Sequence, residues 1–335
     1  MPISSVLGSS ALLPAGLGFR NKIINGDFSI NQRGFSSSTT NGGYGFDRWL
    51  MSADAGATYS AQTFTVGNAI SGYEPTNFAR IVTSGQTGGN YAQFAQRIED
   101  VRTFAGQSVS ISFWAKAASG TPKVAIELQQ NFGTGGSPSG TVLTYVSQVT
   151  LSTTWTRYVV QTIVPSISGK TLGSAGHYFS FAPFVSAGTG FESRTGSLGI
   201  QNNTFDFWGV QLEQNYQPTP FEQRPIGVED FLCKRYYQVW SNSSNTSFMT
   251  IGNQIYSTPM SLSVPMRTIT NTSTTFVATI YGQGTSYALN SLGVTVLDAS
   301  RPQYFTLSGT FSGSWNYSWP LCTFNTHTCI FNAEL

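Results

Sequence analysis

Apolar and polar side chains alternate along much of the chain, and this period of two is far more common than a helical period. Residues 108–117 (SVSISFWAKA) set Val109, Ile111, Phe113 and Ala115 against serines, Trp114 and Lys116. Residues 123–132 (KVAIELQQNF) set Val124, Ile126 and Leu128 against Ala125, Glu127 and Gln129. Because successive side chains of a β-strand point to opposite faces, both segments predict half-buried strands.

Other segments have the composition of strands. Residues 156–165 (TRYVVQTIVP) and 204–213 (TFDFWGVQLE) are rich in β-branched and aromatic residues and are bounded by turn residues. Loops rich in glycine and serine lie between the predicted strands, at residues 87–90, 132–140 and 186–199. Short strands, frequent turns and little helix predict an all-β fold, with a jelly-roll β-sandwich over residues 21–225.

One helix is predicted, as a linker over residues 226–240. The segment GVEDFLCKRYYQVW follows Pro225, begins with acidic residues and carries Lys234 and Arg235 toward its other end, which complements the helix dipole. A mostly apolar stripe consists of Phe231, Leu232, Arg235, Tyr236 and Val239. Two interpretations remain open: the helix packs on its own domain, or it meets its symmetry mates on an oligomer axis.

The composition changes after this helix. A polar spacer leads into residues 274–282, 292–298, 302–311 and 329–335, which predict strands of a smaller C-terminal β domain over 241–335. Pro265 makes residues 260–268 an edge strand or a strand start. At the other end, residues 1–20 predict an uncharged arm that docks on another surface, because ordering such an arm alone costs conformational entropy.

Charge is scarce. Charged residues make up 10% of the 335 residues and the net charge is +2, whereas ordinary soluble domains carry roughly 25%. The chain therefore lacks the basic stripe that binds a phosphate backbone, and nucleic acid is not expected as a partner. No apolar run reaches the roughly 18 residues of a membrane span. A surface of Ser, Thr, Asn, Gln and Gly suits sugar contact, and it also suits a rigid β-rich shell protein.

The residues that usually carry chemistry are few. The three cysteines, Cys233, Cys322 and Cys329, predict small buried hydrophobes, and with His327 the last two match no closed zinc site. There is no nucleophile elbow, no phosphate-binding loop and no His-Glu-x-x-His motif. We expect a protein that is not an enzyme and has no metal site, although folding could still pair two carboxylates as in glycosidases.

The segment YGFDRW, residues 44–49, is the most distinctive polar cluster. We expect Asp47, Arg48 and Trp49 to form a structural clamp at a strand end, with the indole anchoring the sandwich. The alternative is that Trp49 is a platform for a sugar ring.

Aromatic residues in polar loops are the candidates for glycan contact. A flat ring beside Asn, Gln and Ser donors suits the face and hydroxyls of a pyranose. The candidates are Tyr73, Tyr91, Phe132, His177 and Tyr178. For each of them the competing interpretation is that the ring folds back on the sandwich or meets a neighbouring subunit.

Several segments together resemble a family of tailed-bacteriophage virion proteins that are often described as tail-fibre or appendage proteins. They are NKIINGDFSINQRG (21–34), YGFDRWL (44–50), SVSISFWAKA (108–117), TWTRYVVQTIVP (154–165) and the long segment 205–238, with the arm and the C-terminal end. The central part is similar to the jelly rolls of carbohydrate-binding modules. In such modules the Asn-Gly-Asp-Phe opening strand lies beside the closing strand, so the turn at 25–27 should begin the sandwich close to where residues 206–213 end it.

The resemblance implies a virion protein, made in the host cytoplasm, that forms part of a fibre or spike and contacts host cell-surface polysaccharide. It would dock to other virion proteins through the arm. The arm, the helix and the C-terminal unit are surfaces that a monomer would leave exposed, so we expect a homotrimer. The alternative is a capsid decoration (cement) protein. A polysaccharide depolymerase is a third possibility, but the short repeats of a β-helix are missing.

One position departs from the family pattern. Many such modules have an acid directly after the phenylalanine of the opening, where it helps to hold a structural calcium. Ser29 occupies that position here, which argues against calcium, although Asp27, Asp206 and Glu213 would supply oxygen ligands. No cofactor is expected.

Overall fold

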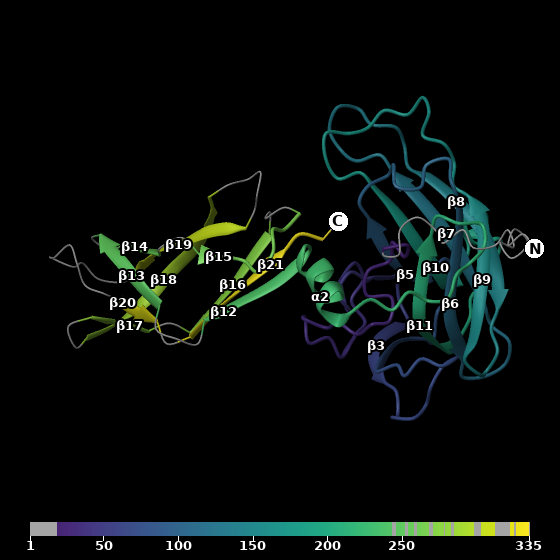
Figure 1. The fold of residues 1–335 in the computed structure, drawn as a ribbon, viewed down its shortest axis with the longest axis horizontal. Coiled ribbons are helices and arrows are strands. Elements are labelled where there is room, and N and C mark those ends of the chain that lie inside the picture. The colour runs from purple at the N-terminus through teal and green to yellow at the C-terminus, as the bar shows by residue number, and fades with distance from the viewer. Residues whose placement is uncertain are drawn as a thin grey trace, which may run out of the picture. The chain divides into compact units, whose positions relative to one another are not determined.

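The computed structural model describes residues 19–242, 246–251, 254–257, 260–267, 271–277, 279–282, 285–297, 303–311, 322–324 and 326–334. The chain divides into two compact units, of which the first ends at Arg224 and the second spans Pro225–Glu334. Both consist mainly of antiparallel strands (Figure 1). The predicted all-β class, a jelly-roll sandwich followed by a short helix and a smaller β unit, is confirmed. The predicted arm lies outside the described residues, apart from its last two.

Two antiparallel sheets form the first unit. The six-stranded sheet has the order β1-β3-β4-β11-β6-β9. Its strands are β1 (Ser37–Ser38), β3 (Ala57–Thr63), β4 (Asn77–Thr83), β11 (Asn203–Glu213), β6 (Ser108–Ala117) and β9 (Thr156–Ile163). The five-stranded sheet has the order β2-β5-β10-β7-β8. Its strands are β2 (Leu50–Ala53), β5 (Tyr91–Ile98), β10 (Tyr178–Ala187), β7 (Lys123–Asn131) and β8 (Val142–Thr150). Strands far apart in sequence are therefore neighbours in each sheet, as in a jelly roll.

The core lies between the two sheets and follows the predicted alternation. The apolar face of β6 is buried to within 1% exposure and joins the core: Val109, Ile111, Phe113 and Ala115. Trp114 lies on the opposite face of the same strand, in a separate aromatic cluster with Trp208. Strand β6 is therefore buried on both faces, so the predicted core face is confirmed and the prediction that the strand is only half-buried is wrong.

Tyr59 connects the two sheets across the core. It lies on β3, and its hydroxyl is 2.9 Å from the carbonyl oxygen of Ser52 and 2.7 Å from that of Gln93, both in the other sheet. Burial raises the pKa of the Tyr59 phenol above its ordinary value. The hydroxyl therefore stays protonated and holds the two sheets together.

The opening segment runs beside the closing strand, as the resemblance implied. The amide of Val210 donates to the carbonyl oxygen of Gly26 at 2.8 Å, and the amide of Lys22 donates to that of Leu212 at 2.9 Å. A Cβ on Gly26 would lie 2.2 Å from the carbonyl oxygen of Val210. This close approach of two backbones explains why glycine follows Asn25.

The prediction that the opening segment forms a strand is wrong. Residues 21–30, all of which are described, form turns and irregular backbone. Asn25 and Phe28 have φ values of 57° and 58°, in the left-handed region that extended strands do not enter. A short segment with two such residues cannot pair as a regular strand, so its backbone groups bond individually to β11.

The second unit begins with helix α2 (Ile226–Lys234) and continues in two sheets. A three-stranded sheet has the order β12-β21-β16, with β12 (Tyr237–Asn242), β21 (Thr326–Asn332) and β16 (Asn271–Val277). The other has the order β14-β13-β20-β17-β18-β19-β15, and β14 also pairs with β19. Its strands are β13 (Thr246–Ile251), β14 (Gln254–Ser257), β15 (Met260–Ser261), β17 (Thr279–Gly282), β18 (Thr285–Val296), β19 (Tyr304–Phe311) and β20 (Cys322–Phe324).

The predicted strand at 302–311 corresponds to β19, and those at 292–298 and 329–335 overlap β18 and β21. Only the first residues of 260–268 form a strand, and Pro265 follows it, as a residue without a backbone donor should. Cys233 is buried as expected. The side chains of Cys322 and Cys329 lie outside the described residues. No helix in the described part of the chain has the length and apolar character of a membrane span.

The predicted helix 226–240 is too long. Helix α2 ends at Lys234, and Tyr237 already begins β12, which pairs with β21. Aromatic and β-branched residues favour the extended backbone at this point.

The predicted apolar stripe is therefore divided between two elements. Phe231 is 56% exposed on the helix and Val239 is 43% exposed on β12, whereas Tyr236 is buried between the two elements. Leu232 is half-buried and Arg235 is exposed. These five residues do not share a helical face, so the second of the two interpretations, an oligomer interface, has no common surface on α2.

Candidate functional site

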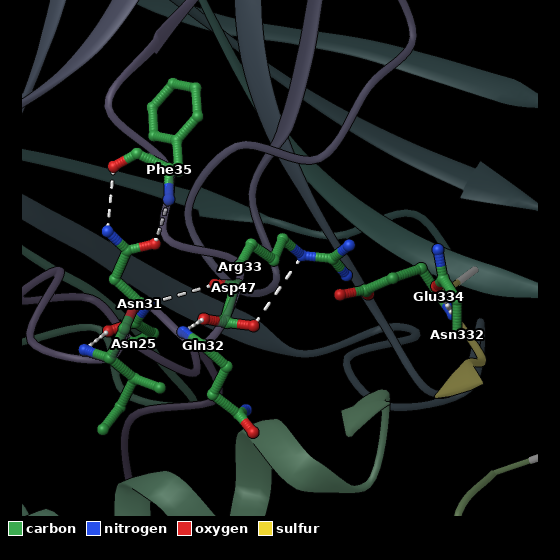
Figure 2. A network of polar contacts seen from close by, with 9 residues as sticks. Asn25, Asn31, Gln32, Arg33, Phe35, Asp47, Asn332 and Glu334 are labelled. Atoms are coloured by element: carbon green, nitrogen blue, oxygen red, sulfur yellow. Dashed lines mark hydrogen bonds and ion pairs between the residues drawn. The ribbon is translucent and has the colours of Figure 1, made fainter. Parts of the chain in front are cut away.

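Asp47 is part of a buried polar network at the start of the sandwich (Figure 2). Its carboxylate accepts a hydrogen bond from the Gln32 amide at 2.6 Å and lies 3.7 Å from Arg33 Nε. The Asp47 carbonyl oxygen accepts from the side-chain amide of Asn25 at 3.1 Å. The carboxylate therefore organises the backbone between Asn25 and Arg33 and does not face solvent.

Arg48 and Trp49 are buried beside it. Arg48 has a φ of 74°, and its guanidinium donates to the carbonyl oxygen of Arg97. The Trp49 indole donates to the Asn25 carbonyl oxygen at 2.9 Å, and its ring centroid lies 5.0 Å from that of Phe94. Trp49 is only 2% exposed. These contacts are those of a structural clamp, and burial leaves no ring face for a sugar.

The outer face of the five-stranded sheet, which we define as the face turned away from the core, gathers the remaining candidates. Alternation along β5 places Tyr91, Gln93 and Arg97 on this face, because Ala92, Phe94 and Ile98 belong to the core. The same rule places Tyr178 and Ser180 of β10 on it, together with Glu127 and Gln129 of β7.

One end of the outer face combines an aromatic ring with several polar groups. The Arg97 guanidinium carbon lies 4.7 Å from the centroid of the Tyr178 ring, within cation–π range. Beyond the ends of β5 and β10, His177 Nδ1 lies 3.9 Å from the Asp100 carboxylate, which also accepts from Arg102 at 2.9 Å, so this polar group belongs to the loops and not to the Tyr178 ring. All of these side chains except that of Arg102 are half-buried, so they are held in place and still reach solvent.

A buried ion pair occupies the middle of the outer face. Arg194 of α1 (Glu192–Thr195) donates two hydrogen bonds, at 2.7 and 2.8 Å, to the carboxylate of Glu127, which also accepts from Gln129 at 2.6 Å. The Glu127 side chain is fully buried. Its hydrogen bond raises the pKa of Arg194, with burial acting in the opposite direction. The pair fixes the loop that carries α1 onto the sheet.

Tyr91 lies at the other end of the outer face. Its hydroxyl is 2.8 Å from the Ser52 hydroxyl, and its ring centroid is 4.6 Å from that of Phe191. Tyr91 and Arg97 are on one strand, so the two ends lie roughly 20 Å apart at about 3.3 Å per residue. The outer face thus has a ring at each end, but its middle is covered by the α1 loop, where Ala125, Phe184 and Ala187 form a buried apolar cluster.

The other two candidate rings lie elsewhere. Tyr73 packs on the opposite sheet, with its ring 5.5 Å from that of Trp208 and its hydroxyl donating to the Phe221 carbonyl oxygen at 3.1 Å. Phe132 is 1% exposed. Its expected contact with a glycan is wrong, because the ring is buried inside the domain, as the competing interpretation had it.

Sequence reasoning missed Arg97, Asp100 and Arg194. The alternation in YAQFAQRI, residues 91–98, could have placed Arg97 on the face of Tyr91. No local signal pairs Arg194 with Glu127, because these residues are far apart in the chain and meet only after the loop folds over the sheet.

The acids considered for calcium are engaged by protein donors at separate places. Asp27 accepts from the Ser29 hydroxyl at 2.8 Å, Asp206 accepts from Arg80 at 2.7 and 2.9 Å, and Glu213 accepts from the Thr219 amide at 2.7 Å. Among the described residues, no three His, Cys, Asp or Glu side chains gather as metal ligands do.

Comparison with known proteins gives structural likenesses alone. No protein-family model matches the chain, and no curated protein matches it. The enzymatically active domain of bacteriophage CBA120 tailspike protein 4 is 14% identical, with 58% of this chain and 22% of that chain covered and a TM-score of 0.34. This chain therefore spans about a fifth of the length of that domain.

Two carbohydrate-binding modules are also similar. The xylan-binding CBM22-2 domain from Paenibacillus barcinonensis is 18% identical over 52% of this chain and 94% of that chain, with a TM-score of 0.34. The family 11 module from Clostridium thermocellum, in complex with a mixed-linked tetrasaccharide, is 11% identical over 55% and 99%, with a TM-score of 0.32. At such identities the roles of individual residues are not transferable.

Proposed function

We propose that this protein is a structural component of a tailed-phage virion, a fibre or spike subunit whose sandwich binds host cell-surface polysaccharide. The binding surface is the outer face of the five-stranded sheet. The observation that carries the proposal is the Arg97 guanidinium over the Tyr178 ring at one end of that face, with Tyr91 at the other.

The chemistry of this face fits a neutral sugar chain. Ring faces pack against the C–H groups of a pyranose, and amide, guanidinium and carboxylate groups bond its hydroxyls. Ligand sites commonly combine aromatic rings with a few fixed polar groups. The end around Tyr178 has a ring with the Arg97 guanidinium over it, and Gln129 lies on the same face of the neighbouring strand β7. The low charge of the chain leaves hydroxyl recognition as the main source of affinity.

The proposed role is binding without catalysis. The buried carboxylates of Asp47, Glu127 and Asp206 each form an ion pair with an arginine, and such a pair stabilises the fold. Hydrolysis of a glycoside needs two carboxyl groups facing one bond. Sustained release of reducing sugar from host polysaccharide by the purified protein would contradict this part of the proposal.

Calorimetric titration of the full chain with envelope polysaccharide from the host tests the glycan site. Tyr178→Ala and Arg97→Ala should each weaken binding roughly tenfold or more, because each removes one half of a stacked pair. Trp155→Ala is the control, since Trp155 packs with Phe64 and Phe78 on the opposite sheet. Loss of binding in the control alone would place the site on the other sheet, and absence of binding by the wild-type protein would refute the glycan role.

The virion role rests on the sequence resemblance of residues 21–34, 44–50 and 205–238 to appendage proteins. Mass spectrometry of purified particles tests it. A few dozen copies or fewer per particle would support an appendage, and hundreds would indicate the decoration protein. Attachment through the N-terminal arm is part of the same proposal, and truncation of residues 1–18 should then abolish incorporation.

A further inference from the structure

Two segments that are far apart in the chain meet where the sandwich begins and ends. Residues 19–23 follow the predicted arm, and residues 222–224 precede the second unit. Phe19 and Glu222 are 203 residues apart in sequence and in direct contact. We call the contacts between the two segments the entry–exit clip, because the chain enters the sandwich through one segment and leaves it through the other.

Glu222 holds the first segment by its backbone amides. Its carboxylate accepts hydrogen bonds from the Phe19 amide at 2.6 Å and from the Asn21 amide at 2.7 Å. The Glu222 amide in turn donates to the side-chain oxygen of Gln211 at 2.8 Å, and Gln211 is fully buried on β11. Because hydrogen bonds to a charged group are stronger than those between neutral groups, Glu222 ties residues 19–21 firmly to the closing strand.

Arg224 holds the same segment by its carbonyl oxygens. Its guanidinium donates to the Asn21 carbonyl oxygen and, at 3.2 Å, to that of Ile23. The guanidinium carbon also lies 5.7 Å from the centroid of the Phe19 ring, within cation–π range. Glu222 and Arg224 are both half-buried, so water competes only in part for these bonds. Two side chains of opposite charge therefore bond the donors and the acceptors of one short segment.

The order of these contacts gives the two segments a relative direction. Glu222 contacts residues 19 and 21, whereas Arg224 contacts residues 21 and 23, so the two segments run parallel. A force applied before residue 19 and after residue 224 would pull these parallel neighbours past each other. All bonds of the clip would then resist together, because none can open before the others lengthen.

The other backbone contacts of the opening segment have the opposite direction. Lys22 bonds to Leu212 of β11, and Gly26 bonds to Val210. This pair is antiparallel, so the same force would separate it from one end, one hydrogen bond at a time. Bonds that open singly give little resistance, so most of the resistance to the force falls on the clip.

We infer that the entry–exit clip is a mechanical clamp, which carries a force on the ends of the chain so that the sandwich is not pulled open. Such a clamp suits a protein that is held at one end while another part is pulled. In a fibre or spike subunit the pull would arise between the particle-bound arm and the rest of the chain, and this use rests on the proposed function. The clamp itself depends only on residues 19–23, Gln211, Glu222 and Arg224.

Magnetic tweezers, with the full chain attached to a surface and a bead by its two ends, test the inference at constant force. Unfolding of the first unit should lengthen the chain by roughly 70 nm at about 3.6 Å per residue, nearly twice the step of the second unit. Glu222→Ala and Arg224→Ala should each shorten the lifetime of the folded first unit roughly tenfold, because each removes two hydrogen bonds to a charged group.

Arg80→Ala is the matched control. It also removes two hydrogen bonds to a charged group, at 2.7 and 2.9 Å to Asp206, but these bonds join β4 to β11 within one sheet. It should lower the thermal midpoint about as much as the clip variants and leave the lifetime under force nearly unchanged. Near-ultraviolet circular dichroism without force establishes that the variants fold. If Glu222→Ala does not fold, Glu222→Gln replaces it, because glutamine keeps the shape of the side chain and removes the charge.

A folded clip variant with the wild-type lifetime under force overturns the inference. So does a control whose lifetime shortens as much as that of the clip variants, because the clip would then add only general stability. Without force, the Phe19 and Asn21 amides should be protected from hydrogen exchange in the wild type and exchange at least roughly tenfold faster in Glu222→Ala. Unprotected amides in the wild type also overturn the inference. The measurements need neither particle nor polysaccharide, so their failure is distinguishable from failure of the proposed function.

Discussion

Replacing Asn25 by alanine tests whether the buried polar network around the opening turn stabilises the sandwich. Asn25 is fully buried. Its side-chain amide donates to the carbonyl oxygens of Ile30 at 2.8 Å and Asp47 at 3.1 Å, and its oxygen accepts from the Ile30 amide at 2.9 Å (Figure 2). Alanine removes all three bonds and lets no water replace them.

The loss of stability in Asn25→Ala follows from the backbone groups that lose a hydrogen-bond partner. A buried backbone group that loses its hydrogen bond costs about 1–3 kcal/mol, so three groups cost about 3–5 kcal/mol when the carbonyls keep part of their bonding. The φ of 57° at this position adds to that, because alanine is less tolerant of the left-handed region than asparagine by roughly 1 kcal/mol. The sum, about 4–6 kcal/mol, is a large part of the 5–15 kcal/mol typical of a whole domain.

Calorimetry of the full chain measures the effect, and hydrogen exchange of the Ile30 amide assigns the transition to the first unit. At about 2–4 °C per kcal/mol for a unit of this size, the midpoint should fall by roughly 10–20 °C. Asn31→Ala is the matched control, because the exposed Asn31 side chain makes two similar bonds to Phe35, at 2.7 and 2.9 Å. Water can replace those bonds, so the control should lose at most about 1 kcal/mol. An equal fall in the thermal midpoint for Asn25→Ala and Asn31→Ala would contradict this expectation.

Three further substitutions test other contacts. Tyr59→Phe should lower the free energy of unfolding by about 1–2 kcal/mol at neutral pH. Because burial raises the pKa of Tyr59 in the folded protein above the ordinary value near 10, the extra stability of the wild type should be full below pH 10 and shrink above it. Urea unfolding that shows a constant difference in stability up to pH 11 would contradict this. Glu127→Ala should cost about 3 kcal/mol by leaving Arg194 without its carboxylate, and it should speed hydrogen exchange in residues 191–199. The control Glu192→Ala removes one exposed bond, from the Gly190 amide at 2.8 Å, which water can replace, so it should cost at most about 1 kcal/mol. Gly26→Ala should lower the free energy of unfolding by about 3 kcal/mol, and with it the thermal midpoint, because the new Cβ would lie 2.2 Å from the Val210 carbonyl oxygen. Gly140→Ala has open space around its Cβ and should leave the midpoint unchanged.

The strands of the first unit were predictable because their pattern is local. Val109, Ile111 and Phe113 alternate with serines and Trp114, and this pattern gives the face of β6 that enters the core. The cover on its other face comes from Trp208 and Phe221, which are distant in sequence from Trp114. The burial of Trp49 followed in the same way from a large ring beside strand signals. Helix α2 was predicted with its start correct and its end wrong, because Tyr236 and Tyr237 suit a strand as well as a helix.

The candidate site was predictable only in part. Residues Tyr91 and Tyr178 were named from their polar surroundings, but polarity also pointed to Phe132, which is buried. Local composition does not say whether a ring at a strand end turns inward or outward. That depends on which strand lies next to it, and the neighbours of β10 are β5 and β7.

The sequence by itself determined that this chain is built from strands with an apolar and a polar side, that it carries little charge, and that its catalytic resources are few. Strand order was decided by the tertiary structure, since β11 lies between β4 and β6 through contacts that no local pattern encodes. The same long-range pairing brought Arg194 to Glu127 and placed the two longest unpaired edges, β8 and β9, on one side of the sandwich. The physical reason is that alternation tells each strand which face to bury, whereas its partners follow from the packing of the whole core.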